Sequence, residues 1–275
     1  TMETIRWNGY TIQTDFHPVP TTPSMPGIGQ GNMWQPINTK VVDGNLQLSI
    51  ERNGVATRQG QEVWAAAEAV VQKEAKFGKY CCTFKVVDEH GAPAWGQFDL
   101  ENSEPNITTI FGIFLYNEAG TGGANTHDEI DFLELGYQNQ PNNADSWINQ
   151  QPGGPTATNA QYVIQPWNAD GQQPNWDYLH RFAIDTSKIP ASGEVTIMAN
   201  WSAEGTPVEF ALAYGSYTTA NFPTTDTVTW TSAESANGAV LGEHPDTKLH
   251  INLWPYGGPT TDAPVFVQVT NLEMP

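Results

Sequence analysis

Apolar and polar residues alternate with a period of two along much of this 275-residue chain. In residues 248–254 every second residue is leucine or isoleucine, and His250, Asn252 and Trp254 stand between or after them. Three further segments repeat the alternation: residues 46–51, 195–201 and 208–214. Successive side chains of a strand point to opposite faces, so each segment predicts a strand with one buried face. The chain is therefore predicted to be all-β.

The length allows one large β domain or two small ones. No linker rich in proline, serine or glycine separates two apolar blocks, so we predict a single domain over residues 1–275. Cys81 and Cys82 are the only cysteines, and as strand neighbours they would point to opposite faces. A disulfide between them would be strained, and their spacing does not suit zinc.

Charge and hydropathy limit the kinds of partner that the chain can bind. The formal net charge is −19, which repels phosphate backbones and argues against nucleic-acid binding. It also disfavours strongly anionic polymers, such as sulfated or uronic ones, as partners. Solubility, or a salty or acidic habitat, explains the charge equally well. No run of 18 apolar residues predicts a membrane span.

Residues 127–136 hold three carboxylates, Glu129, Asp131 and Glu134, among large apolar side chains. Acids rarely tolerate burial without a task. Glu129 and Asp131 would share one face of a strand, whereas Glu134, three residues further on, would turn away. A β-bulge at Phe132–Leu133 would return it to the shared face. We therefore predict that the three carboxyls converge.

The expected spacing suits glycoside hydrolysis. Four rises of about 3.3 Å separate the Cα atoms of Glu129 and Glu134 by about 13 Å, and each side chain leans inward by about 4 Å. The remaining distance of about 5 Å is that of retaining glycosidases. Glu129 would then be the nucleophile, Glu134 the acid/base and Asp131 a hydrogen-bonding helper. At least one of the three pKa values should be raised.

Two other interpretations of these acids stay open. His127, Asp128, Glu129 and Asp131 offer nitrogen and oxygen atoms to a metal ion. No second histidine follows at ligand spacing, so we predict no metal. An acid-rich strand with a purely structural role is the other alternative.

The pattern Glu-x-Asp-x-x-Glu resembles the active-site strand of family 16 glycoside hydrolases. Four other segments are similar to segments of that family and occur in the same order: residues 77–85, 107–116, 179–185 and 249–254. The resemblance implies a concanavalin-like β-jelly roll of two curved antiparallel sheets with a concave substrate cleft. It implies the same roles for Glu129, Asp131 and Glu134. The extra residue at the bulge resembles the laminarinase, agarase and carrageenase subgroup.

The resemblance also affects two local predictions. Residues 63–76 have the composition of a helix, but the family match implies strand around residues 67–69, and we follow it because tertiary context often overrides propensity. Many family members bind a structural calcium ion through a backbone carbonyl and a late aspartate. Gly44 fits the first role, but Thr270 stands in place of the second, so calcium is not predicted and no cofactor is required.

The sugar-binding residues are expected to be aromatic or polar. Indole rings stack on pyranose faces, which makes Trp254 the first candidate. Asn252 and His250 share its strand face, Trp95 lies in a predicted loop, and His180 matches a family histidine. Trp201 is expected in the core.

These observations predict a retaining endo-β-glycosidase. A β-1,3 or mixed-linkage glucan is the favoured substrate, and a galactan such as agar comes next. The rival is a non-catalytic, lectin-like carbohydrate-binding protein on the same scaffold. Polymers do not enter cells intact, so we expect a secreted monomer whose signal peptide has been removed, with no nucleic-acid or membrane partner.

Overall fold

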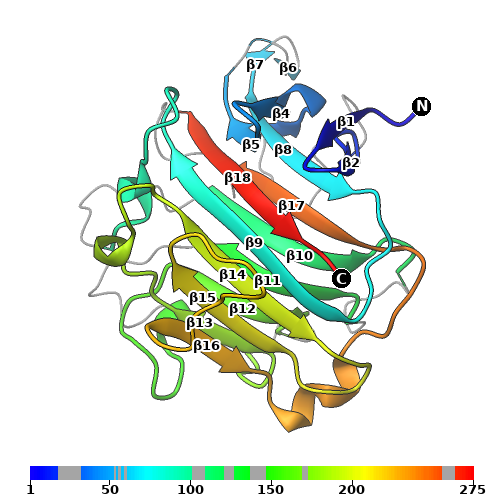
Figure 1. Cartoon of the computed structure of the whole chain (residues 1–275), viewed down its shortest axis with the longest axis vertical. Coiled ribbons are helices and arrows are strands. Elements are labelled where there is room, and N and C mark those ends of the chain that lie inside the picture. The colour runs from blue at the N-terminus through cyan, green and yellow to red at the C-terminus, as the bar shows by residue number, and fades with distance from the viewer. Residues whose placement is uncertain are drawn as a thin grey trace.

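The computed structural model describes residues 1–17, 32–52, 54, 57–58, 61–100, 109–120, 127–136, 147–168, 173–255 and 264–275. Two large sheets pack face to face, and in Figure 1 the second sheet lies in front of the first. This arrangement confirms the predicted β-jelly roll.

The first sheet carries the candidate site. Its strands, in spatial order, are β1 (Thr4–Trp7), β2 (Tyr10–Gln13), β8 (Trp64–Val71), β17 (Thr247–Pro255), β10 (Thr109–Asn117), β11 (Glu129–Leu135), β12 (Ala160–Gln165) and β13 (Leu179–Phe182). These neighbours pair antiparallel, whereas β3 (Asn32–Trp34) pairs parallel to β8.

The second sheet backs the first. Its spatial order is β16 (Thr227–Thr231), β15 (Glu209–Tyr214), β14 (Val195–Trp201), β9 (Gly78–Val87), β18 (Val265–Glu273), β5 (Asn45–Ile50) and β4 (Thr39–Val42). Two further short strands, β6 (Thr57–Arg58) and β7 (Gln61–Glu62), pair antiparallel with each other. The short 3-10 helices are η1 (Pro36–Asn38), η2 (Trp95–Phe98), η3 (Trp147–Asn149), η5 (Thr186–Lys188) and η6 (Glu234–Ala239).

One apolar core fills the space between the sheets. Leu249, Ile251 and Leu253 of β17 are fully buried in it, as the alternation predicted. Trp201 is also fully buried there. Cys82 belongs to the core, whereas the thiol of Cys81 donates to the carbonyl oxygen of Tyr217, and both cysteines are free.

The segment with helix composition is a strand. All eight residues of β8 are buried, and the strand pairs with β2, β3 and β17. Pairing with these three strands and burial of both faces override the local preference for helix. Within the described part of the chain, no helix is long and apolar enough to cross a membrane.

Candidate active site

A β-bulge shapes the strand that bears the three acids. Across the β10–β11 pair, Ile113 faces Leu133 and Phe114 faces Asp131, so Phe132 is an extra residue on β11. The β11–β12 pair shows the same shift between Asp131 and Glu134. The bulge lies where the sequence predicted it, and it turns Glu134 to the side of Asp131.

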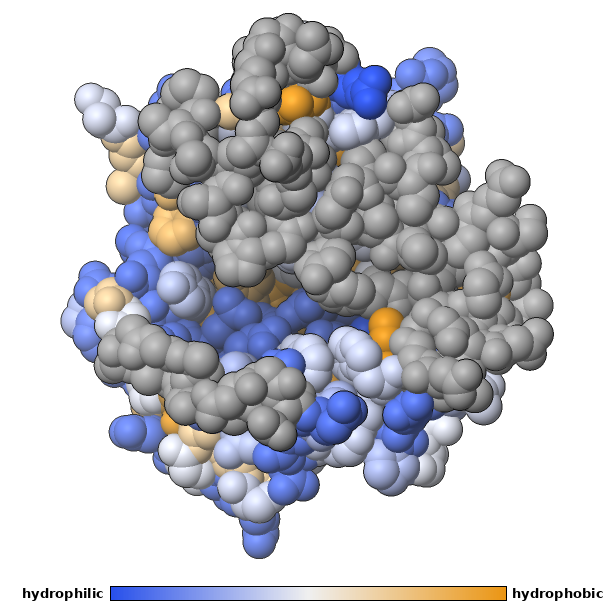
Figure 2. Space-filling view, turned by 180° about the vertical axis from the view of Figure 1, so that it is seen from behind, coloured by the Kyte–Doolittle hydropathy of each residue, from blue (hydrophilic) through white to orange (hydrophobic). Residues whose placement is uncertain are grey.

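The three carboxyls converge on the outer face of the first sheet. One oxygen from each of Glu129, Asp131 and Glu134 lies within 4.8 Å of the others. Asp131 is 1% exposed, whereas the other two are partly exposed. Figure 2 looks at this side of the molecule and shows hydrophilic side chains gathered in a hollow across its middle.

Gly112 of β10 lies beside Glu134 and leaves the sheet surface open there. It faces Glu134 on one side and Asn252 of β17 on the other. A Cβ atom at this position would come within 2.7 Å of Oδ1 of Asn252. Any larger residue would therefore displace the Asn252 side chain and reduce the space beside the acids.

Two glutamines of β12 hold the acids. The amide nitrogen of Gln165 donates to Oδ2 of Asp131 and to Oε1 of Glu134, at 3.0 Å each. Gln161 donates to Oε2 of Glu134 at 3.3 Å and accepts from the guanidinium of Arg181 on β13. The sequence prediction missed all three residues, although the alternation in residues 160–165 could have placed both glutamines on one face.

Burial sets the protonation of two of the acids. It raises the pKa of Glu129 to about 7, although a hydrogen bond from Asp131 acts in the opposite direction. Burial and the neighbouring carboxyls raise the pKa of Asp131 well above its ordinary value. Asp131 therefore keeps its proton and donates it in a hydrogen bond to Glu129, which favours ionised Glu129.

A second polar cluster, made of His17, Glu68, Glu118, Lys248 and His250, lies beside the acids. Its centre is His250, whose two ring nitrogens lie 3.3 Å from Glu68 and 3.1 Å from Glu118. Nε2 of His17 is 3.1 Å from the same Glu68 oxygen, and Lys248 pairs with Glu118 at 3.1 Å. Burial opposes ionisation of Glu68, but the two neighbouring histidines lower its pKa to about 2.

This cluster corrects the prediction for His250. The side chain is on the predicted face, but it is fully buried. Phe16 and Phe114 contact its ring, with centroids at 4.8 Å and 5.2 Å. Both ring nitrogens contact carboxylates, those of Glu68 and Glu118. His250 is therefore a buried residue beneath the site and not a direct sugar contact.

Asn252 and Trp254 are partly exposed on the same face, as the alternation predicted. The Asn252 amide nitrogen donates to Glu68 at 3.1 Å, which leaves the amide oxygen near Gly112. Trp254 packs against Trp34, with ring centroids 6.5 Å apart. Both residues remain predictions for substrate contact.

Trp95 and His180 do not lie beside the acids. Trp95 is 6% exposed, packs in the core near Phe84, and donates its indole hydrogen to the carbonyl of Gly193. His180 stacks on Trp230 of the second sheet, with centroids 5.7 Å apart. It therefore faces the space between the sheets, and Arg181, one residue later, faces the acids.

The carboxyl oxygens of Glu129, Asp131 and Glu134 lie close enough together to hold a metal ion, so the absence of a metal stays a prediction. His127 stacks on Tyr178, and no histidine of the described residues joins the cluster formed by Glu129, Asp131 and Glu134. The carbonyl oxygen of Gly44 accepts the indole hydrogen of Trp7 at 3.0 Å. Thr270 stands where a carboxylate ligand would be expected, and its hydroxyl donates to Glu194. These donors do not fit a structural calcium ion of the expected kind.

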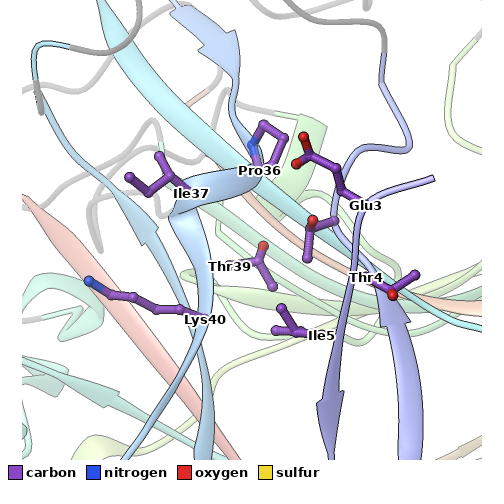
Figure 3. Close-up of a pocket in the computed structure, with 8 residues that line it drawn as sticks. Glu3, Thr4, Ile5, Pro36, Ile37, Thr39 and Lys40 are labelled. Atoms are coloured by element: carbon purple, nitrogen blue, oxygen red, sulfur yellow. The ribbon is translucent and has the colours of Figure 1, made fainter. Parts of the chain in front are cut away.

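Another hollow, of about 530 Å³, opens at the edge formed by β1 and the segment from η1 to β4. Figure 3 shows its lining, which consists of Glu3, Thr4, Ile5, Thr14, Pro36, Ile37, Thr39 and Lys40. It contains neither the three acids nor an aromatic ring on which a sugar could stack. The cluster of the three acids is therefore the candidate active site.

The fold is shared with solved β-glucanases. The laminarinase catalytic domain of Thermotoga maritima aligns with a TM-score of 0.55 at 15% identity, over 90% of this chain and 84% of that one. The β-glucanase of Bacillus licheniformis aligns with a TM-score of 0.52 at 13% identity, over 98% and 92%. SCLam, a non-specific endo-β-1,3(4)-glucanase from family GH16, aligns with a TM-score of 0.53 at 13% identity, over 88% and 80%.

These likenesses show that the fold is a β-jelly roll, as the family resemblance implied. No protein-family model matches the sequence. No curated protein matches it either.

Proposed function

We propose that this protein is a family 16 glycoside hydrolase, a retaining endo-β-glycosidase that cleaves a β-linked glucan by double displacement. One observation carries the proposal. Glu129, Asp131 and Glu134 bring carboxyl oxygens within 4.8 Å of one another on the outer face of the first sheet, in a fold shared with known glucanases. Oxygens this close are compatible with the carboxyl separation of roughly 5–5.5 Å in retaining enzymes.

The hydrogen bond between Asp131 and Glu129 fits distinct roles for the acids. Protonated Asp131 donates to Glu129 and favours the carboxylate that attacks the anomeric carbon. As the glycosidic bond breaks, Glu134 gives its proton to the leaving oxygen and a glycosyl-enzyme ester forms. Glu134 then accepts a proton from water, whose oxygen attacks the same carbon, displaces Glu129 and restores both acids.

The substrate class rests on the fold relatives and the charge. Two relatives described above are a laminarinase and an endo-β-1,3(4)-glucanase, so a β-1,3 or mixed-linkage β-glucan is the first candidate and a galactan such as agar the second. The net charge of −19 favours a neutral polymer. We propose Trp254 as a stacking surface and Asn252 as an acceptor for a sugar hydroxyl.

The rival is a lectin-like protein that binds glycans without turnover. Burial of two carboxyls with raised pKa values costs folding free energy, and a binding protein has no need of that cost. Reducing-end release from laminarin, lichenan, agarose and carrageenan distinguishes the two functions. Release that is lost in Glu134→Gln, by at least about 100-fold, supports the enzyme. Binding without release over days would support the lectin.

The remaining expectations are proposals of the same kind. The protein works as a secreted monomer without a cofactor, and its partner is the polysaccharide rather than nucleic acid or membrane. An unchanged rate after dialysis against EDTA, together with a sedimentation mass of one chain, supports this. Loss of the rate on chelation would instead favour a metal held by the three acids.

A further inference from the structure

Arg181 stands at the end of a line of cross-strand neighbours that passes through Glu134. The line crosses six strands of the first sheet in the order Glu68, Asn252, Gly112, Glu134, Gln161 and Arg181. Arg181 is fully buried, although arginine is among the residues that folding buries least often. The mechanism proposed above does not use it.

The guanidinium of Arg181 is held rigidly. Its Nε and one terminal nitrogen donate to Oγ1 of Thr158, at 3.0 Å and 2.8 Å. The backbone of Arg181 is tied to the side chain of Gln151, which accepts from its N–H at 2.7 Å and donates to its carbonyl oxygen at 3.2 Å. The other terminal nitrogen is thereby aimed at Oε1 of Gln161, 3.0 Å away.

This contact determines which way the Gln161 amide points. A guanidinium carries only donors, so Gln161 must present its oxygen to Arg181. The amide nitrogen is then directed at Oε2 of Glu134, 3.3 Å away. If the amide were flipped, its nitrogen would face the donors of Arg181. Its oxygen would face the carboxyl oxygen of Glu134. The buried positive charge therefore excludes the flipped state.

We propose that Arg181 is a positioning residue for Glu134 and acts through the Gln161 amide. The proposal rests on the acid/base role of Glu134 given above. Arg181 keeps a donor on one carboxyl oxygen of Glu134, while Gln165 holds the other oxygen. The carboxyl thus keeps one orientation for both proton transfers.

A double-mutant cycle tests whether Arg181 acts through Gln161. Gln161→Leu and Arg181→Met should each lower kcat on the best glucan by about 10-fold with KM within about twofold, because only the transition state requires the aligned acid. The double variant should be no slower than the slower single variant. Multiplied losses in the double variant would show independent effects and overturn the proposal.

A charge substitution tests the same link without removing the buried arginine. In Gln161→Glu the new carboxylate can still accept from Arg181, but its other oxygen faces Glu134. We expect the alkaline limb of the pH–rate profile to move up by about one pH unit, because like charges favour the protonated acid. Gln72→Glu, which adds the same charge at a residue bonded to Gln13 and the Val70 carbonyl, is the control and should not move it. An unmoved limb in Gln161→Glu would contradict the proposal.

One readout does not need activity. The side-chain amide of Gln161, assigned by its loss in Gln161→Leu, should give a single sharp pair of NMR signals in the wild type. The pair should broaden or double in Arg181→Lys, which cannot form the same fork with Thr158. An unchanged pair in a folded Arg181→Lys would overturn the proposal even if no glycan in the panel were cleaved. Absence of cleavage with the expected NMR change would reject only the proposed function.

Discussion

Asp131 donates a hydrogen bond to Glu129, and both carboxyls have raised pKa values because the folded chain buries them. The pair therefore holds a proton on Asp131 while the partly exposed Glu129 can ionise near neutral pH. This relationship determines how activity and stability should depend on pH.

Removing the proposed nucleophile should abolish turnover without unfolding the protein. Glu129→Ala leaves a small space beside the hollow where azide can bind and attack the sugar from the same side. We expect no measurable release from a glucan, a melting temperature within a few degrees of the wild type, and formation of an α-glycosyl azide from an activated β-glycoside when azide is added. Wild-type rates in this variant would remove Glu129 from its role.

The hydrogen bond from Asp131 should appear in the acid limb of kcat/KM. In the wild type this limb reports ionisation of Glu129, whose pKa is about 7. In Asp131→Asn the side-chain amide can still donate to Glu129 and adds no charge, so the acid limb should stay at the same pH. Asp131→Ala removes the donor and should move the limb to higher pH by about one unit. If the acid limb lay at the same pH in both variants, Asp131 would not donate a hydrogen bond to Glu129 in the wild type.

Stability should fall as pH rises through the titration of Glu129. Its pKa is raised from 4.5 in the unfolded chain to about 7 in the folded one, so its contribution is complete below pH 4.5 and is lost by about pH 7. Glu129→Gln cannot ionise. At pH 8 its free energy of unfolding should therefore exceed that of the wild type by about 2 kcal/mol. Each unit of pKa shift corresponds to about 1.4 kcal/mol, and the partial exposure of Glu129 reduces the total. Urea melts of both proteins at pH 4 and pH 8 measure the difference, which should vanish at pH 4.

The cluster around Glu68 should have the opposite pH dependence. The pKa of Glu68 falls from 4.5 to about 2 on folding, so its contribution is complete above pH 4.5 and is lost as pH falls through 2. Glu68→Gln should lower the free energy of unfolding by about 3 kcal/mol at pH 7. Guanidinium melts should show this loss shrinking between pH 4 and pH 2. A loss that does not change with pH would mean that packing, and not charge, holds Glu68.

Much of the fold and the three acids could be predicted because both depend on local patterns. The alternation in residues 248–254 identified the buried leucines of β17, and the odd interval between Asp131 and Glu134 required the bulge at Phe132. These are properties of a single strand. They do not depend on which strand lies next to it.

The rest of the site depends on register between strands that are far apart in the sequence. Gln161, Gln165 and Arg181 reach the acids only because β12 and β13 pair beside β11 with a shift at the bulge. His250 was expected to be exposed, but Phe16 and His17, more than 230 residues earlier, lie against it and against Glu68. Trp95 was expected at the cleft because its loop could not be placed relative to the core.

The stereochemistry of the first product tests the central claim most directly. The account predicts that ¹H NMR spectra taken in the first minutes of hydrolysis show the β-anomer of the new reducing end, followed by slow mutarotation to the α-anomer. Initial release of the α-anomer would mean a single displacement, and the convergent acids Glu129 and Glu134 would then not act as nucleophile and acid/base.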